Sequence, residues 1–301
     1  MQRIIVIVGP TASGKSDLAV ALANRFDGEV ISADSRQVYR GLDIGTGKIT
    51  QSEMRGIPHH LLDVASPSRV FTAHDFAKHA RRAITEIAAR GHTPIIAGGT
   101  GFYIDALVGR IALAPVKIDK ALRKKLDGKT TKQLLALLRR RDKVRAEAVV
   151  AKNEMNNRHR LIRAIEISYT KKMSAHAHPT PAYDILWIGI KPNPQILKER
   201  IRLRLTQRLD AGMTTEGEHL HASGLSYKRM EALGLEYRYL ALFLQKKITR
   251  GELVEQLSAK IWQYARRQTT YWKRNTAIHW LPLQKTADMV AQAQKVLSEL
   301  W

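Results

Sequence analysis

A glycine-rich turn near the N-terminus restricts the fold of this chain more than any other sequence feature. Residues 9–16 read GPTASGKS and fit the pattern G-x-x-x-x-G-K-[ST] without a mismatch. The β-branched run Ile4–Val8 precedes the turn, and Ser16–Arg25 follows it with helical character. This order is typical of a phosphate loop, in which glycines let successive backbone N–H groups point at phosphate oxygens. A chance match is the alternative, and the agreement between motif and flanking elements disfavours it.

The chemistry of the loop predicts a diphosphate or triphosphate ligand. The helix N-terminus supplies a partial positive charge, Lys15 supplies a full one, and the Ser16 hydroxyl suits Mg²⁺. The apolar run Thr93–Ala97 ends in Gly-Gly-Thr, without the Asp that nucleotide hydrolases use to hold Mg²⁺. This favours a phosphate-handling transferase over a motor or GTPase. The predicted phosphate-binding residues are Gly9, Pro10, Thr11, Ala12, Ser13, Gly14, Lys15 and Ser16.

Strand and helix patterns alternate in the first third of the chain. Glu29–Ala33 and Thr93–Ala97 are short apolar runs, and Phe71–Arg90 has the period of an amphipathic helix. A further apolar run, Ile185–Ile190, resumes the pattern late in the chain. Such alternation predicts an α/β fold, a P-loop NTPase-like parallel sheet with helices on both faces.

The segment 114–184 lacks β-type runs and shows apolar residues at helical spacing, with HAHPTPAY (176–183) as its exit loop. We therefore expect a helical insertion domain at 114–184 within a core formed by 1–113 and 185–301. After Pro194 the pattern is mostly helical, and it predicts helices over 195–211, 227–233, 237–245 and 250–273.

Charge is distributed unevenly along the chain. Residues 1–110 hold 13 basic and 10 acidic residues, whereas 111–301 hold 37 basic and 17 acidic ones. This asymmetry predicts a small-molecule site in the first part and a polyanion-binding surface in the rest; a generally basic protein is the alternative. The chain has no cysteine, which excludes disulfides, thiolate zinc sites and cysteine nucleophiles. No membrane span or secretory segment is expected, so the predicted compartment is the cytoplasm.

Asp34 follows the predicted strand Glu29–Ala33 at the sheet edge where the phosphate loop also lies. Ligands of open α/β sheets bind at that edge. A carboxylate there can accept a proton from a group that attacks the phosphate-bound substrate. Alternatively, Asp34 caps the following turn or reaches Mg²⁺ through water. Nearby Ser35, Gln37 and Tyr39 could contact a nucleobase or be ordinary loop residues.

Several motifs together resemble those of the bacterial tRNA dimethylallyltransferases, also called tRNA isopentenyltransferases of the IPP transferase family. These are GPTASGKS, ISADSRQVYRGLDIGTGK, PHHLLD, AGGTGFY, NNRHRLIRAIEI, ERIRLRLTQRLDAGM, GLSYKRMEALGLEYRYL and QYARRQTTYWKRN. The resemblance spans residues 4 to about 275. It implies transfer of a dimethylallyl group from dimethylallyl diphosphate to the exocyclic amine of the adenosine 3′ of a tRNA anticodon. Diphosphate is then released. The expected cofactor is Mg²⁺, and the expected partner is the anticodon stem-loop of tRNA, bound by a monomer of this chain.

The same resemblance implies roles for single residues. Asp34 would be the base, Thr100 would lie beside the reacting amine, and Arg204 would bind diphosphate. From the residues alone, Thr100 could equally be a helix N-cap and Arg204 one of a solvated row of arginines. Contacts with tRNA are implied for Asp34, Ser35, Arg36, Gln37, Thr100, His159, Arg160, Leu161, Ile162, Arg163, Arg267 and Lys273.

Some residues depart from the family pattern. Ile49 stands where proline is common, and Asn156–Arg160 differs from the usual approach to the tRNA-contact segment. The C-terminal run 263–274 interleaves aromatic and basic residues, as in RNA-binding surfaces, but a helix with an apolar stripe and a basic solvated face would look the same. Two other functions remain open at this point. One is a P-loop small-molecule or nucleoside kinase with Asp34 as base, and the other is a non-catalytic RNA-binding module.

Overall fold

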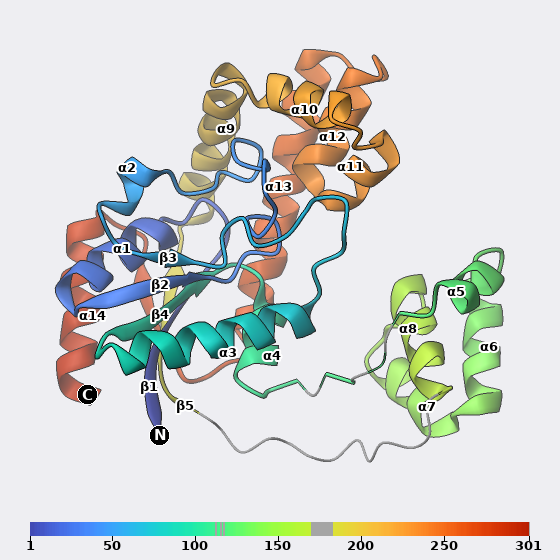
Figure 1. Cartoon of the computed structure of the whole chain (residues 1–301), viewed down its shortest axis with the longest axis horizontal. Helices are drawn as coiled ribbons and strands as arrows, with labels where there is room; N and C mark the ends of the chain where they lie inside the picture. Colours follow the sequence, from blue (N-terminus) through green and yellow to red (C-terminus); the bar gives the residue numbers. More distant parts are fainter. Residues whose placement is uncertain (112, 115, 117, 170–182, 301) are drawn as a thin grey trace. The chain divides into compact units, whose positions relative to one another are not determined.

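The computed structural model describes residues 1–111, 113–114, 116, 118–169 and 183–300 (Figure 1). The chain divides into two compact units, one formed by Met1–Ile111 and Thr180–Trp301 and the other by Ala112–Pro179. The predicted insertion, 114–184, differs from the second unit by a few residues at each end. Its predicted exit loop, 176–183, lies outside the described residues except for Tyr183. Each unit is treated separately below.

The first unit is built on a parallel sheet, as the alternating strand and helix patterns predicted. Over the described residues the sheet has six strands in the order β3-β2-β4-β1-β5-β6, and every neighbouring pair is parallel. Buried apolar runs form its centre, because parallel strands are covered on both faces. The strands are β1 (Gln2–Val8), β2 (Gly28–Ser32), β3 (His59–His60), β4 (Thr93–Gly98), β5 (Tyr183–Lys191) and β6 (Ile278–Pro282).

Helices cover both faces of this sheet, which confirms the predicted fold class. Helices α1 (Lys15–Arg25) and α14 (Thr286–Leu300) share an apolar core with Ile5 and Ile7 of β1. The opposite face is covered by α3 (Ala73–Ala89), which contacts β2 and β4, and by α4 (Gly101–Leu107), which packs on α3. Thr72 and Asp75 form a capping box that fixes the start of α3.

The rest of the first unit is a helical cluster with a core of its own. Side chains from α9, α12 and α13, including Leu205, Tyr237 and Leu257, are buried together. In the described part of the chain no helix is long and apolar enough to cross a bilayer. The helices are α9 (Pro194–Asp210), α10 (Met213–Ala222), α11 (Tyr227–Leu233), α12 (Leu235–Leu244) and α13 (Arg250–Trp272), with a short α2 (Gln51–Met54) near the sheet.

Two elements of the C-terminal part differ from the sequence-based expectation. β6 and α14 follow α13, where the pattern predicted only helix up to about residue 273. β6 has five residues and pairs with β5 alone. Because an edge strand is less buried than a central one, its sequence need not be a long apolar run, and it was not predicted. α14 then completes the apolar layer on α1.

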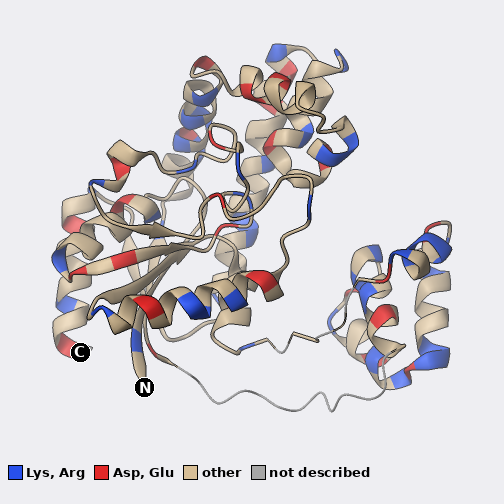
Figure 2. Cartoon of the chain, viewed as in Figure 1, with Lys and Arg blue, Asp and Glu red and all other residues tan. Residues whose placement is uncertain are grey.

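The second unit is a small helical domain. Its core contains Leu126, Leu134, Leu138, Leu161 and Ile165. Lys and Arg are prominent on its helices (Figure 2), in keeping with the 18 basic and 7 acidic residues of segment 114–184. The helices are α5 (Lys120–Leu126), α6 (Thr131–Arg141), α7 (Lys143–Ala151) and α8 (Arg158–Ser168).

Candidate active site

The phosphate loop lies between β1 and α1, where the motif predicted it. Gly14 adopts φ 84°, in the left-handed region that favours glycine, directly before the first residue of α1. The Ser13 hydroxyl is fully buried and has no hydrogen-bond partner within the described residues. An unpartnered buried hydroxyl is costly, so this loop is built to receive an additional polar group.

Lys15 lies at the centre of the charges around the loop. Its Nζ donates a hydrogen bond of 2.6 Å to the Pro10 carbonyl. Burial lowers the pKa of Lys15 to about 8, while the negative charge of Asp34 opposes that shift and the positive charge of Arg204 adds to it. Two of the three predicted catalytic side chains, Asp34 and Arg204, therefore act on the same ammonium group.

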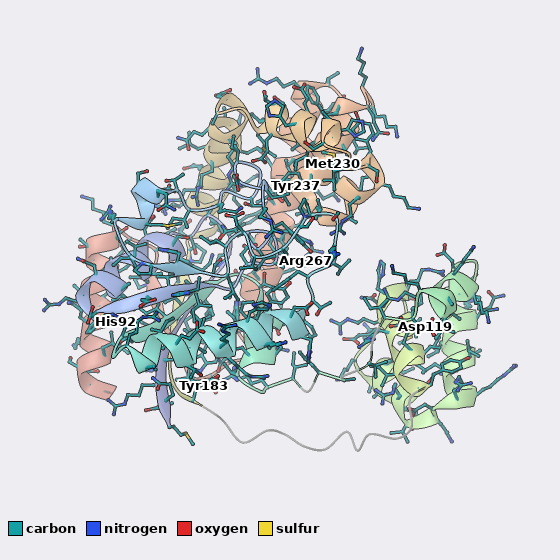
Figure 3. The ribbon with its side chains drawn as sticks, viewed as in Figure 1. His92, Asp119, Tyr183, Met230, Tyr237 and Arg267 are labelled. Atoms are coloured by element: carbon teal, nitrogen blue, oxygen red, sulfur yellow. The ribbon has the colours of Figure 1, made fainter. Side chains whose placement is uncertain are left out.

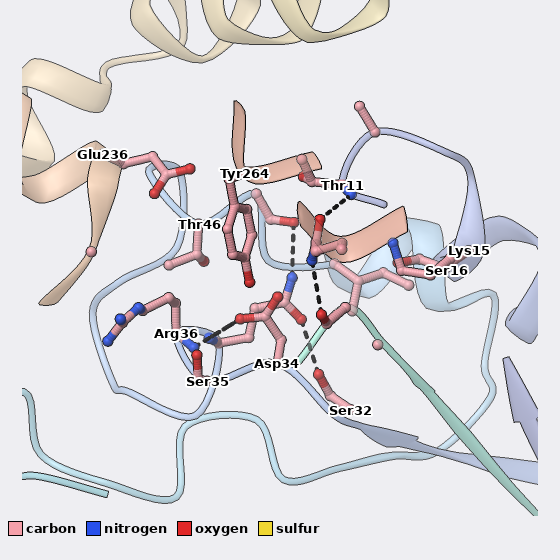
Figure 4. Close-up of a pocket in the computed structure, with 18 of the residues that line it drawn as sticks. Thr11, Lys15, Ser16, Ser32, Asp34, Ser35, Arg36, Thr46, Glu236 and Tyr264 are labelled. Atoms are coloured by element: carbon pink, nitrogen blue, oxygen red, sulfur yellow. Dashed lines mark hydrogen bonds between the residues drawn. The ribbon is translucent and has the colours of Figure 1, made fainter. Parts of the chain in front are cut away.

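A single cavity of about 340 Å³ joins the loop to six of the other predicted site residues (Figure 4). In Figure 4 Asp34 lies between Lys15 on one side and Arg36 on the other. The cavity lining does not include Gly9, Pro10 or Thr100. Thr100 is nevertheless hydrogen-bonded to Ser35, which is a lining residue. Of the predicted residues, the lining contains Thr11, Ala12, Ser13, Gly14, Lys15, Ser16, Asp34, Ser35, Arg36, Gln37, Arg204 and Arg267.

Asp34 uses one carboxylate oxygen to hold its own turn. Its Oδ1 accepts hydrogen bonds from the backbone N–H groups of Arg36 at 2.8 Å and Gln37 at 3.4 Å. Within the described residues no hydrogen bond is made to Oδ2. The turn-capping role considered from the sequence is therefore present, and it leaves the second oxygen available for a ligand. The capped turn fixes the direction of the carboxylate, as a proton acceptor requires.

Thr100 is held beside Asp34 by a close approach of β4 to the end of β2. A Cβ at Gly98 would lie 2.2 Å from the Ala33 carbonyl oxygen, so only glycine permits this approach. The Thr100 hydroxyl then accepts a hydrogen bond of 3.0 Å from the Ser35 N–H. Thr100 occupies the N-cap position of α4, but its side chain makes no capping hydrogen bond. Its hydroxyl instead faces the loop that carries Asp34.

Tyr264 of α13 completes this side of the cavity. Burial, with the negative charge of Asp34, raises the pKa of Tyr264 to about 12, and a hydrogen bond with the Thr100 side chain opposes the shift. Tyr264 is thus a neutral phenol beside Asp34 and Thr100. The sequence placed it in the aromatic and basic run 263–274 without giving it a separate role.

Two arginines one helical turn apart on α9 line the cavity, Arg204 and Arg208. Arg202 and Arg204 are both exposed, but Arg202 does not line the cavity. Burial lowers the pKa of Arg208, while Glu236 opposes that shift. A Cβ at Gly47 would lie 1.9 Å from an Arg208 guanidinium nitrogen, so the glycine makes room for this side chain. Arg208 therefore provides a second cation that can bind a diphosphate. From the sequence alone, Arg208 was indistinguishable from the solvent-exposed arginines of this helix.

A carboxylate fixes the loop that carries Gly47. Glu216 of α10 accepts hydrogen bonds from the backbone N–H groups of Asp43, Ile44 and Gly45 at 2.7–3.0 Å. It also accepts one from the Tyr237 hydroxyl at 2.7 Å. Figure 3 locates Tyr237 on α12 and Arg267 on α13. These bonds hold one wall of the cavity against the helical cluster.

Gln268 connects the phosphate loop to the turn after β4. Its Oε1 accepts a hydrogen bond of 2.9 Å from the Thr11 N–H, and its Nε2 donates one of 2.9 Å to the Gly99 carbonyl. The side chain is buried. Gln268 therefore fixes the distance between the phosphate loop and the segment that holds Thr100.

We expect Gln268→Leu to lower the free energy of unfolding by about 1–3 kcal/mol, since it leaves a buried N–H and a buried carbonyl without partners. Gln263→Leu is the matched control, because Gln263 is an exposed glutamine on the same helix. Urea unfolding of both variants measures the difference. Equal stability of the two variants would contradict the bridging role.

The lowered pKa of Lys15 predicts proton uptake when diphosphate binds. Below pH 8 Lys15 is already charged in the free protein; above pH 8 it is neutral. A bound diphosphate favours the charged form and raises this pKa, so binding near pH 8.5 should take up a proton and weaken as pH rises. Titration calorimetry with inorganic diphosphate in two buffers of different ionisation enthalpy counts the protons.

Lys15→Arg is the control for this measurement, because a guanidinium stays protonated in this pH range. We expect the variant to show only the proton exchange of diphosphate itself. The same proton count in both proteins would rule Lys15 out as the group that titrates.

The residues predicted to contact tRNA in the second unit differ in exposure. His159 and Arg160 are exposed, and Arg160 forms an ion pair with Glu154. Leu161 and Ile162 belong to the core of the unit, so their side chains do not present a surface to RNA. The physical reason is the helical period of α8, which turns these two positions inward while Arg160 faces solvent.

Arg163 is engaged inside the second unit. It forms an ion pair of 3.1 Å with Glu166, and it donates a hydrogen bond of 2.7 Å to the Val116 carbonyl. Arg123 also pairs with Glu166, at 2.6 Å, and these contacts lower the pKa of the buried carboxyl. Lys273, the last predicted RNA contact, is exposed at the end of α13 and does not line the cavity.

Four side chains of the site were not predicted: Arg208, Glu236, Tyr264 and Gln268. Tyr264 and Gln268 lie in the run 263–274, whose aromatic and basic pattern was the available signal. The spacing of Arg204 and Arg208 by four residues was the signal for a shared helix face. Glu236 lies in the family motif GLSYKRMEALGLEYRYL, but nothing in that motif pointed to a role for this residue. Tyr39, considered as a base contact, is buried and accepts a hydrogen bond from the Phe71 N–H through its hydroxyl.

Comparison with known proteins decides among the remaining functions. The sequence model of the IPP transferase family matches residues 37–275, most of the chain. The chain belongs to this family, that of the tRNA dimethylallyltransferases. A tRNA dimethylallyltransferase of Trichlorobacter lovleyi is 41% identical over 98% of this chain and 96% of that protein. Membership confirms the predicted family and enzyme class and disfavours the kinase.

Solved structures of the family agree with this assignment. The tRNA isopentenylpyrophosphate transferase of Bacillus halodurans has a TM-score of 0.75 and 32% identity, covering 100% of this chain and 97% of its own. The corresponding enzyme of Staphylococcus epidermidis has a TM-score of 0.73 and 36% identity, covering 99% of each chain. The described part of the chain thus shares the fold of these relatives.

Proposed function

We propose that this chain transfers a dimethylallyl group from dimethylallyl diphosphate to the exocyclic amine of the adenosine 3′ of the anticodon in tRNA. One observation carries the proposal. In a chain of this family, the phosphate loop and the free oxygen of Asp34 face the same cavity. A diphosphate in the loop and an amine at Asp34 would meet there.

The reaction replaces a carbon–oxygen bond with a carbon–nitrogen bond. The bond between C1 of the dimethylallyl group and the bridging oxygen breaks, and its electron pair leaves with diphosphate. The lone pair of the adenine amine forms the new bond to C1, and the amine proton passes to Asp34 Oδ2. Because the amine lone pair is delocalised into the ring, removal of its proton assists the attack.

Cations around the cavity stabilise the charge that develops on diphosphate. Lys15, Arg204 and Arg208 all face this cavity, and the loop N–H groups add fixed dipoles. Guanidinium groups bind diphosphate oxygens in a bidentate manner. Thr100, held by Ser35 and beside Tyr264, orients the acceptor amine toward Asp34.

A magnesium ion fits this site through Ser16. The hydroxyl of Ser16 lines the cavity at the first turn of α1, and Mg²⁺ in phosphate sites binds few protein oxygens together with phosphate and water. The described residues contain no cluster of three or more His, Asp or Glu side chains that would hold the ion alone. When bound, Mg²⁺ would neutralise charge on the leaving diphosphate.

The RNA partner is the anticodon stem-loop of tRNA. Arg36, Arg238 and Arg267 line the cavity, with Arg36 on the side away from Lys15 (Figure 4), and His159 and Arg160 are exposed on the second unit. The target adenine must leave the loop stack to enter the cavity, at a cost of a few kcal/mol. The proposed form is a monomer acting in the cytoplasm.

The test is direct. The protein is incubated with labelled dimethylallyl diphosphate, Mg²⁺ and unmodified tRNA. One part of the RNA is digested to nucleosides to identify the product, and another part is digested to oligonucleotides to locate the label. We expect labelled N6-dimethylallyl adenosine from a single loop position. Labelled RNA with the prenyl group elsewhere, or unlabelled RNA, would contradict the proposal.

Electrostatic binding of RNA predicts a steep dependence of affinity on salt. If the basic part of the chain neutralises about five phosphates, log K falls with log[salt] at a slope of about −4 to −5. Filter binding of an anticodon stem-loop between 50 and 300 mM KCl measures the slope. A flat response would mean that the excess of basic residues after residue 110 is not the RNA surface.

A further inference from the structure

A carboxylate far along the chain, that of Glu236, faces the reaction cavity, and the reaction proposed above does not use it. Glu236 lies in the first turn of α12 and lines the same cavity as Asp34. Burial raises the pKa of Glu236, while its own backbone amide and the charge of Arg208 oppose the shift. Within the described residues its carboxylate has no hydrogen bond with another side chain and no ion pair within 4.0 Å. Glu236 is half-buried, so its unpaired carboxylate is open to a ligand in the cavity.

Glu236 lies on the side of the cavity away from the phosphate loop. In Figure 4 it appears beyond Tyr264 and Thr46 from Lys15, on the same side as Arg36. Gly234, two residues earlier, packs against Arg36, since a Cβ there would lie 2.9 Å from Arg36 Nε. Arg36, which is assigned above to RNA, lies on this side, so we place Glu236 toward the incoming nucleotide rather than toward the phosphate loop.

Neutralising Arg208 is the simplest structural role for Glu236, and the geometry gives it little support. The two groups influence each other's pKa, yet no carboxylate oxygen of Glu236 lies within 4.0 Å of an Arg208 nitrogen among the described contacts. Arg208 instead donates a hydrogen bond of 3.4 Å to the Gly45 carbonyl. Glu236 therefore retains its capacity to accept hydrogen bonds.

A carboxylate among cations discriminates between the parts of an RNA. It repels phosphate groups, which the surrounding arginines attract, and it accepts hydrogen bonds from base amines. Adenine and cytosine carry exocyclic amines, whereas uracil has none, and a carboxylate is a common partner for the amine of cytosine. A carboxylate that repels phosphate groups and binds a base amine contributes to specificity both by repulsion and by attraction.

We propose that Glu236 is a specificity-determining residue that accepts a hydrogen bond from the exocyclic amine of an adenine or cytosine next to the target. The base that Glu236 binds is not the target adenine, because the amine of the target must meet Asp34. It is therefore a base next to the target. This inference rests on the proposed function, and it adds a reader of a second base to the same cavity.

The experiment removes one amine at a time from the RNA. Anticodon stem-loops are made with each adenosine or cytidine of the loop, other than the target, replaced singly by purine riboside or 2-pyrimidinone riboside. These analogues lack only the amine. Prenylation by the full chain gives kcat/KM for each RNA with wild type and with Glu236→Ala.

We expect wild type to lose about tenfold or more in kcat/KM at one loop position. Glu236→Ala should react slowly with the parent RNA and lose no further activity at that position. Glu236→Gln, which keeps an acceptor oxygen, should retain part of the discrimination, and it serves as the second variant if the alanine variant fails to fold. Glu255→Ala, an exposed acid on α13, should discriminate as wild type does.

Equal losses for wild type and Glu236→Ala at every position would overturn the role of Glu236 while leaving the proposed function intact. Failure of wild type to prenylate the parent stem-loop would instead overturn the proposed function, and this inference with it. The two failures are therefore distinguishable in one set of reactions.

Discussion

Asp34→Asn should lower kcat for prenyl transfer by about 10²–10⁴-fold, the usual contribution of a positioned general base. Asparagine keeps an oxygen that can accept the turn bonds from the Arg36 and Gln37 N–H groups, so the loop should keep its conformation. What is lost is the anionic oxygen that takes the amine proton. Single-turnover rates at saturating dimethylallyl diphosphate and tRNA measure the effect.

Affinity for tRNA is the control for this variant. Its dissociation constant should change by less than about threefold, since the carboxylate is not a phosphate contact. Asp288→Asn, an exposed acid in the first turn of α14 that does not line the cavity, should leave the rate close to wild type if the effect belongs to Asp34. A wild-type rate for Asp34→Asn would remove this residue from the role of base.

Lys15→Met should weaken binding of dimethylallyl diphosphate and slow the chemical step, together costing about 10²–10³-fold in kcat/KM, as for loss of one preorganised charge-stabilising group. The methionine fills similar volume without the ammonium that meets the leaving diphosphate. Equilibrium dialysis of the labelled donor gives the binding part, and single-turnover rates give the chemical part.

Lys198→Met is the matched control, because Lys198 is exposed on α9 and does not line the cavity. It should bind the donor as wild type does. An unchanged dissociation constant for Lys15→Met would contradict the assignment of residues 9–16 to the diphosphate.

The central strands of the sheet were predictable because each contains a short apolar segment between helical patterns. β1, β2, β4 and β5 are buried on both faces, and nothing but a parallel sheet accommodates such runs between helices. β3 and β6 were not predicted because they are short and lie at the sheet edges, where pairing with one neighbour decides their conformation. The family of the chain was predicted correctly from its motifs, which combine a phosphate loop with DSRQVYRGLDIGTGK.

The site was predictable where residues are close in sequence to the sheet edge. The phosphate loop and Asp34 follow their strands directly, so strand position alone places them. Arg208, Glu236 and Gln268 lie far along the chain, on helices whose orientation toward the cavity depends on tertiary packing. Spacing could not show that Arg204 lines the cavity while Arg202 does not, and only the resemblance favoured Arg204.

One measurement tests the central claim most directly, that the phosphate loop binds a leaving diphosphate while carbon is transferred. In a single-turnover reaction with dimethylallyl diphosphate and tRNA, the released diphosphate and the prenylated adenosine are both quantified. ATP is also present as an alternative substrate. The account predicts equal amounts of diphosphate and prenylated adenosine, with the ATP unchanged. Consumption of ATP with phosphorylated acceptor, and dimethylallyl diphosphate recovered intact, would contradict it.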